Sequence, residues 1–223
     1  MYDLIINAYD NGYRYVVLEA SSHGLYNGRL EGITFDYTIF TNLTRDHLDF
    51  HETMENYALA KQILFKKLKP NGIGITNIDD KYKDYFTCAN MLTYGKNSSD
   101  YQILNYVVSN QNTMIEFKLK DRYLKVNSPL LGEYNIYNLL CAIIILDNLN
   151  VSLDDIKNTI QGLCCPPGRM DTIKYGTNSI IVDYAHTPDA MEHILNTVRK
   201  TTSGNIYTVF GCTGNRDREK RPV

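Results

Sequence analysis

A strand-like run passes directly into a cluster of acidic and imidazole side chains in residues 35–51, which read FDYTIFTNLTRDHLDFH. The first six residues, Phe35 to Phe40, are rich in aromatic and β-branched side chains, as is typical of a buried strand. Two aspartates and two histidines follow between Asn42 and His51. Because open α/β sheets bind ligands in the crevice outside the carboxyl ends of their strands, this position indicates a metal and phosphate site.

Apolar strand-like runs and helical periodicity alternate along the chain, which predicts an α/β protein whose mostly parallel sheet is flanked by helices. We expect strands at residues 13–20, 35–42, 72–77, 179–183 and 207–210, a β-hairpin insert at 101–125, and helices at 52–68, 79–89, 134–149, from Ser152 and from Thr187. The Pro-Pro-Gly break at 166–168 places a domain boundary near Arg169 to Thr172, and so divides the chain into residues 1–169 and 170–223. The second part is short for a complete core, so we expect a truncated chain.

The composition excludes several classes of protein. The 223 residues carry a net charge of -2 and a pI of about 6.2, without the basic field of a nucleic-acid-binding protein. The longest apolar run, 139–146, is too short to cross a membrane, and the first residues lack the features of a signal peptide. We therefore expect a cytoplasmic protein, and we expect its five cysteines, which lack metal-binding spacing, to be reduced.

Three residues are candidates for the metal site. Glu19 closes the first predicted strand, and a magnesium ion that keeps several waters needs few protein carboxylates, so Glu19 is the leading ligand. A solvated strand-end glutamate is the alternative. His47 is either a metal ligand with a fixed tautomer or a hydrogen-bonded partner of Asp46 or Asp49. For Lys61, helical periodicity indicates only a cation that extends from an apolar helix face.

Two functions of other classes also fit these residues. The sequence Asp46-His47-Leu48-Asp49, with His51, is similar to the metal loops of zinc-dependent hydrolases, which would bind zinc tightly and act without ATP. A non-catalytic binding remnant is the third possibility. It would show no affinity for ATP or ADP with Mg²⁺.

The second half of the chain holds candidates for nucleotide binding. Asn135 and Asn138 lie three residues apart at a predicted helix start, where their amides suit a purine edge, although a capping role is the simpler interpretation. Arg169 follows the Pro-Pro-Gly bend and could bind a phosphate through two N–H groups. Asp183 stands between a strand end and a helix start, where an acid can accept ribose hydroxyls.

Seven motifs occur together in an order that resembles the Mur ligase family, and the resemblance covers essentially the whole chain. They are EASSHGL at 19–25, NLTRDHLD at 42–49, YALAK at 57–61, GEYNIYN at 132–138, PGRM at 167–170, VDYAHTPD at 182–189 and GCTGNRD at 211–217. Within the family, the chain resembles the branch that adds the third residue of the peptidoglycan stem peptide.

The resemblance implies a mostly parallel central ATPase domain joined to the start of a Rossmann-like carboxyl-terminal domain. It implies ATP-dependent amide formation through an acyl phosphate, with Mg²⁺ and ATP bound and with UDP-muramoyl-dipeptide and a free amino acid as substrates. The implied catalytic and metal residues are Glu19, His47 and a carbamylated Lys61. The resemblance also implies a monomer that serves cell-wall synthesis.

The resemblance also assigns the binding residues. Ser21, Asn27 and Arg29 would contact the UDP-muramoyl-dipeptide, Asn138, Arg169 and Asp183 would line the ATP site, and the loop 211–220 would face the reacting centre. Asn27 stands where this branch of the family has glutamine.

Two segments of the family pattern have no counterpart in this sequence. One is the G-T-x-G-K-T phosphate loop, expected before residue 1, and the other selects the third amino acid, expected after residue 223. We therefore expect the chain to be inactive alone, and the sequence does not reveal whether the amine is lysine, meso-diaminopimelate or another.

Overall fold

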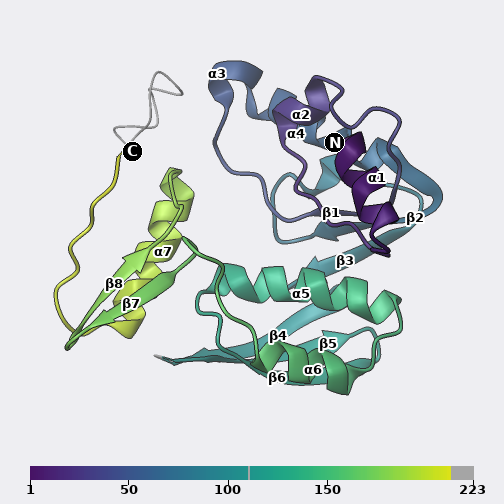
Figure 1. Ribbon diagram of the computed structural model, residues 1–223. Coiled ribbons are helices and arrows are strands. Elements are labelled where there is room, and N and C mark those ends of the chain that lie inside the picture. The colour runs from purple at the N-terminus through teal and green to yellow at the C-terminus, as the bar shows by residue number, and fades with distance from the viewer. Residues whose placement is uncertain (110, 212–223) are drawn as a thin grey trace.

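The computed structural model describes residues 1–109 and 111–211, and its main element is a six-stranded sheet (Figure 1). The strands follow chain order across the sheet: β1 Phe35–Phe40, β2 Leu68–Asn77, β3 Met91–Gly95, β4 Tyr101–Val108, β5 Thr113–Leu119 and β6 Arg122–Ser128. Neighbours from β1 to β4 are parallel, and those from β4 to β6 are antiparallel. The expected mostly parallel sheet flanked by helices is confirmed. The predicted hairpin continues the same sheet.

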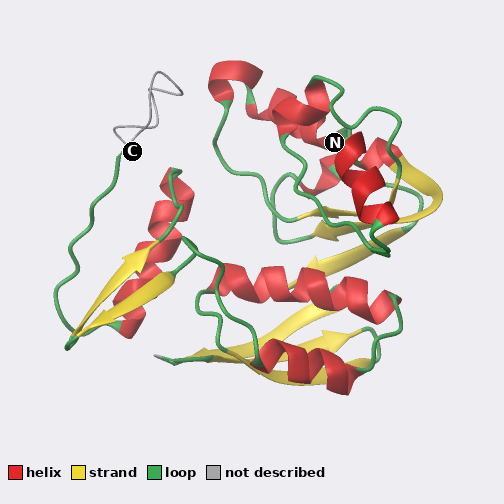
Figure 2. Ribbon diagram, viewed as in Figure 1, coloured by secondary structure: helices red, strands yellow, loops and turns green. Residues whose placement is uncertain are grey.

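Two helices, α5 (Glu133–Asn148) and α6 (Leu153–Gln161), pack on one face of this sheet and enclose its larger core (Figure 2). Leu140 and Ile144 of α5 are fully buried, as is Ile115 of β5. The Ser152 side chain accepts a hydrogen bond from the backbone N–H of Asp155, which fixes the start of α6 as its sequence predicts. Both predicted helices are confirmed.

The opposite face of β2 packs against a second, smaller core. Ile75 belongs to the larger core, whereas Thr76 on the other face donates its hydroxyl to the carbonyl of Phe86, so the side chains alternate with the period of a strand. The smaller core holds Phe40, Leu43, Tyr57, Ala58, Phe65 and Phe86. Its helices lie near the β1 end of the sheet in Figure 1: α2 Ser22–Tyr26, α3 Leu48–His51 and α4 Met54–Gln62, with α1 Tyr2–Asp10 beside them.

The chain after residue 170 forms a separate small layer that we call the carboxyl-terminal unit, residues 171–211. The antiparallel strands β7 (Asp171–Tyr175) and β8 (Asn178–Val182) carry the helix α7 (Pro188–Thr201). The side chain of Thr187 caps α7 and Pro188 begins it, so this helix and β8 are confirmed, whereas β7 was not predicted. Residues 205–211 contain no strand, which contradicts the strand predicted at 207–210.

Three other predictions were wrong. Residues 13–20 form no strand, and Val17 is 96% exposed. The helix predicted at 79–89 is a turn with one short 3-10 segment, Lys83–Tyr85. The helix predicted at 52–68 ends at Gln62, and a 3-10 turn, Phe65–Lys67, leads into β2, where the pairing with β1 shifts register around Pro70.

Besides β7, four elements, α1, α2, α3 and β3, were not predicted. Two further observations concern the described residues alone. None of their helices is both long and apolar enough to span a bilayer. Four cysteines, Cys88, Cys141, Cys164 and Cys165, are free thiols, as expected. Burial raises the pKa of the Cys141 thiol to about 11, which suits a structural side chain.

Candidate functional site

Lys61 lies in the last turn of α4, and its amine is close to the carboxylates of Glu19 and Asp46. Burial lowers the pKa of the Lys61 amine, while the negative charges of Glu19 and Asp46 act in the opposite direction. Its Nζ also lies 5.5 Å from the centre of the Tyr57 ring. A lysine amine whose charged form is opposed by burial and favoured by two carboxylates is an unusual arrangement. The structure brings Glu19 and Lys61 together although residues 13–20 are not a strand.

His47 stands at the start of α3 in a left-handed conformation, with φ of 57°. Its backbone N–H donates to Oδ1 of Asp46 at 2.9 Å, and its Nε2 lies 3.4 Å from Oδ2 of the same carboxylate. Burial lowers the pKa of His47, against the charge of Asp46, and Lys61 is close enough to lower it further. A neutral imidazole is the form that can ligate a metal, so His47 and Lys61 share one environment suited to that role.

A group of packed imidazole and aromatic rings lies beside His47 and Lys61, and it was not predicted from the sequence. The His51 ring is buried, stacks on Tyr57 at 5.1 Å between centroids and shares a 2.9 Å hydrogen bond with the Ser22 hydroxyl. The His23 ring lies 4.8 Å from His47 and 5.5 Å from His51. Burial and the neighbouring histidines lower the pKa of His51. The repeated imidazoles in SSHGL and DHLDFH were the available signal.

The described residues contain no group of three or more His, Cys, Asp or Glu side chains that could hold a metal ion. The zinc hydrolase hypothesis, which needs such a set around Asp46, His47, Asp49 and His51, therefore has no support. The donor set fits magnesium better. Magnesium prefers oxygen ligands, retains several waters and can rely on substrate phosphates, so Glu19 and a modified Lys61 would be adequate protein ligands.

The three predicted substrate residues lie on or next to α2. Ser21 caps this helix, because its hydroxyl accepts a hydrogen bond from the backbone N–H of Gly24 at 3.1 Å. Asn27 ends the helix, and the backbone N–H of Arg29 donates to the carbonyl of Gly24. The short helix thus places Ser21, Asn27 and Arg29 within one compact turn. Their contact with a substrate stays a prediction.

The predicted nucleotide residues lie on α5 and on the connection to the carboxyl-terminal unit. At the start of α5, the Asn135 side chain donates to the carbonyl of Leu131 at 2.8 Å, and Asn138 lies one turn later, 3.5 Å from Asn135. The Arg169 guanidinium lies 4.8 Å from the centre of the Tyr184 ring. Both asparagine amides and the arginine thus retain polar groups for a ligand.

Asp183 stabilises the turn that carries Arg169. Its two carboxylate oxygens accept hydrogen bonds from the backbone N–H groups of Met170 and Ala185, each at 2.8 Å. The Tyr134 phenol on α5 is close enough to Asp183 to be affected by its charge. Burial, and then the charge of Asp183, raise the pKa of Tyr134 to about 12. Tyr134, near the start of α5, is therefore within electrostatic range of Asp183 and Arg169.

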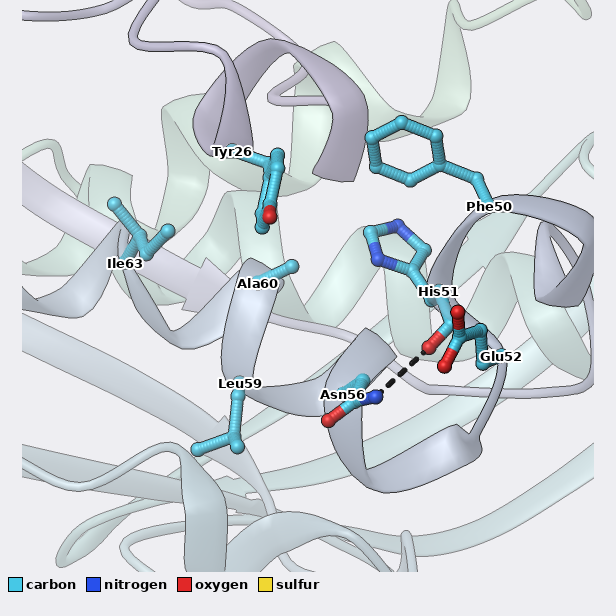
Figure 3. Close-up of a pocket in the computed structure, with 8 residues that line it drawn as sticks. All are labelled: Tyr26, Phe50, His51, Glu52, Asn56, Leu59, Ala60 and Ile63. Atoms are coloured by element: carbon cyan, nitrogen blue, oxygen red, sulfur yellow. Dashed lines mark hydrogen bonds between the residues drawn. The ribbon is translucent and has the colours of Figure 1, made fainter.

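A cavity of about 510 Å³ opens beside the imidazole group (Figure 3). It is lined by Tyr26, Phe50, His51, Glu52, Asn56, Leu59, Ala60 and Ile63. In Figure 3 the Tyr26 and Phe50 rings lie at its upper part, nearly perpendicular to each other at 5.4 Å between centroids, with His51 below Phe50. None of the residues predicted for the ligase site lines this cavity, whereas His51 of the alternative zinc cluster does. Of the predicted loop 211–220, all but Gly211 lies outside the described residues.

Comparison with known families assigns both parts of the chain. A profile described as the Mur ligase middle domain matches residues 2–146, and one described as the Mur ligase glutamate ligase domain matches residues 168–223.

Similar proteins carry one type of name. UDP-N-acetylmuramoyl-L-alanyl-D-glutamate--2,6-diaminopimelate ligase of Fusobacterium nucleatum is 42% identical over 94% of this chain and 44% of its own length. The enzyme numbered 1 of that name in Clostridium acetobutylicum is 43% identical, with the same coverage. A solved structure of a 2,6-diaminopimelate ligase superposes with a TM-score of 0.74 at 37% identity, over 96% of this chain and 45% of that chain. The chain thus spans about half the length of these relatives.

Proposed function

The chain belongs to the Mur ligase family, and from this premise we propose that it forms part of an ATP-dependent ligase of the MurE type. The ligase would join an amino acid to UDP-N-acetylmuramoyl-L-alanyl-D-glutamate in the cytoplasm, as the third residue of the peptidoglycan stem peptide. The observation that carries the proposal is the buried Lys61 amine beside Glu19, Asp46 and His47. The relatives at about 40% identity support the substrate assignment.

In this proposal, the terminal carboxylate of the dipeptide attacks the γ-phosphorus of ATP and ADP leaves. The incoming amine then adds to the carbonyl carbon of the acyl phosphate. The tetrahedral intermediate loses phosphate and a proton, and the amide remains. Each step brings anions together, so the site must neutralise charge and exclude water.

Glu19, His47 and Lys61 would hold Mg²⁺, which supplies positive charge between the carboxylate and the phosphates when it is bound. The Lys61 ammonium would first lose a proton, and the neutral amine would then add to CO₂ and release a second proton, which leaves a carbamate anion in place of the cation. Its lowered pKa favours this reaction, because the neutral fraction of the amine grows as the pH rises through that value. Asn138, Arg169 and Asp183 would contact ATP, and Ser21, Asn27 and Arg29 the muramoyl dipeptide.

Nucleotide binding tests the proposal on the chain itself. Titration with ADP and Mg²⁺ in a calorimeter should give saturable binding to one site. No heat of binding at millimolar ADP would favour the non-catalytic alternative. Zinc retained at one ion per chain through dialysis, with hydrolysis in the absence of ATP, would instead revive the hydrolase hypothesis.

Replacement of Lys61 tests the centre of the site in the complete enzyme. Lys61→Ala should lower kcat by about 100-fold or more, because it removes a charged group that acts at the reacting anions. The control is Lys66→Ala, at an exposed position of the 3-10 turn after α4, for which we expect a change within about twofold. Phosphate release with UDP-muramoyl-dipeptide and an amino acid measures both. Equal effects of the two substitutions would remove Lys61 from the site.

The same assay identifies the amine. The names of the relatives make 2,6-diaminopimelate the first amine to test, with L-lysine as the comparison at equal concentration. A phosphate release rate that is higher with L-lysine would contradict this choice and leave the ligase assignment intact.

A further inference from the structure

One contact joins the carboxyl-terminal unit to the residues around Lys61. Nε2 of His186 lies 3.8 Å from Oδ2 of Asp46, although the two residues belong to different parts of the chain. The His186 side chain is 51% exposed and that of Asp46 is 17% exposed. The half-exposed His186 side chain of one part thus contacts the mostly buried Asp46 carboxylate of the other part.

The loop after β8 orients the His186 ring. Its Nδ1 lies 2.9 Å from the carbonyl oxygen of Tyr184, and its ring packs edge-on against the Tyr184 ring at 5.1 Å. Tyr184 in turn stacks with the Arg169 guanidinium. The imidazole is therefore held by its own unit and directs Nε2 toward Asp46.

Asp46 is equally fixed on its side of the contact. Oδ1 accepts the backbone N–H of His47, and Oδ2 lies between Nε2 of His47 at 3.4 Å and Nε2 of His186 at 3.8 Å. The charge of Asp46 also acts on Lys61. A change in the position of Asp46 would therefore be felt by both His47 and Lys61.

We propose that His186 is a positioning residue, whose contact with Asp46 holds the carboxyl-terminal unit against the loop that carries His47. Other charges link the two parts elsewhere: Asp183 acts on Tyr134, and Lys200 acts on Glu133, both at the start of α5. The His186 contact differs because it reaches the loop 42–51. It is a property of the folded chain, so it stands or falls independently of the proposed function.

Hydrogen exchange followed by mass spectrometry tests the contact on this chain without any ligand. His186→Ala should raise the exchange rate of the amides in residues 42–51 about threefold, as expected when a side-chain contact near the surface is lost. His186→Gln keeps a donor of similar reach and should restore at least half of the protection. The matched control is His193→Ala, because His193 is also about half exposed but lies 3.5 Å from Asp189 within its own helix.

A double-mutant cycle shows whether the effect of His186→Ala on exchange depends on Asp46 or reflects a general loss of stability. If His186 acts through Asp46, the variant Asp46→Asn/His186→Ala should exchange no faster in residues 42–51 than Asp46→Asn alone. Thermal melts will identify any variant that unfolds, which is not expected at a half-exposed histidine. Additive effects of the two substitutions, equal effects of His186→Ala and His193→Ala, or unchanged exchange in His186→Ala would each overturn the proposal.

Discussion

Residues 68–161 and the carboxyl-terminal unit contain similar β-branched sequences but bury them to very different extents. Ile75 and Ile115 in the main sheet are fully buried, whereas Ile173 and Ile180 in the two-stranded sheet remain about half exposed. In the first region α5 and α6 cover the strands, and α5 alone buries seven residues. In the second, α7 buries only Thr197 among its residues. Local β-propensity therefore selects an extended chain, and a covering layer decides whether that chain becomes core.

A pair of isoleucines gives the sharpest test of this difference. Ile144→Ala should lower the free energy of unfolding by about 2–5 kcal/mol, because it opens a cavity among fully buried neighbours in α5. Ile180→Ala, at a side chain that is 54% exposed, should cost less than about 1 kcal/mol. Urea unfolding followed by circular dichroism measures both. Equal losses would mean that the carboxyl-terminal unit has a core comparable to that of the main sheet.

A buried polar contact should give the next largest effect. Asp147 of α5 accepts hydrogen bonds from the Tyr101 hydroxyl, at 2.8 Å, and from the Arg122 guanidinium. Asp147→Ala should lower the free energy of unfolding by about 2–3 kcal/mol. The substitution leaves the buried Tyr101 hydroxyl with fewer hydrogen-bond partners, and it removes the acidic partner of the Arg122 guanidinium.

The matched control uses an exposed ion pair on the same sheet. Glu116 pairs with Lys125 at 2.6 Å across β5 and β6, where both side chains are well exposed. Glu116→Ala should change the free energy of unfolding by less than about 0.5 kcal/mol in the same urea titration. A loss as large as that of Asp147→Ala would show that burial is not what separates the two pairs.

The same dependence on a partner explains which parts of the fold the sequence could predict. α5 and α6 were predicted correctly because periodicity and a capping serine specify a helix locally. Residues 13–20 have the composition of a strand but pair with no strand among the described residues. Residues 79–89 have a helical pattern, but side-chain hydrogen bonds stabilise a different conformation there. Asp80 accepts the backbone N–H groups of Leu43 and Tyr82, which favours a turn over a helix.

The candidate site was predictable to a similar degree. His47 could be chosen because it follows a strand end, Glu19 was chosen from a predicted strand that does not form, and Lys61 could be chosen only from family resemblance. The structure places Glu19 and His47 each within electrostatic reach of Lys61, yet the metal-binding roles of the three residues stay predictions. The contact of His186 with Asp46 was not predicted, because it depends on how two distant segments dock and no local pattern encodes that. Likewise, the stacking of His51 on Tyr57 appears only after folding.

Two helix caps give the smallest expected effect and the finest comparison of the two regions. The Ser152 hydroxyl accepts the N–H of Asp155 at the start of α6, and the Thr187 hydroxyl accepts the N–H of Ala190 at the start of α7. Substitution of either residue by alanine should cost about 1 kcal/mol. Because α6 packs into the main core, Ser152→Ala should accelerate hydrogen exchange across β6 and α5 as well.

Thr187→Ala should accelerate exchange only within α7 and the adjoining strands, since α7 buries little against the rest of the chain. Mass spectrometry of the exchanged peptides distinguishes the two patterns at equal loss of stability. If Thr187→Ala loosened α5 as much as Ser152→Ala does, the carboxyl-terminal unit would be energetically continuous with the main core. The exposed isoleucines of β7 and β8 would then have to be stabilised by docking at His186 and at the start of α5, rather than by a core of their own.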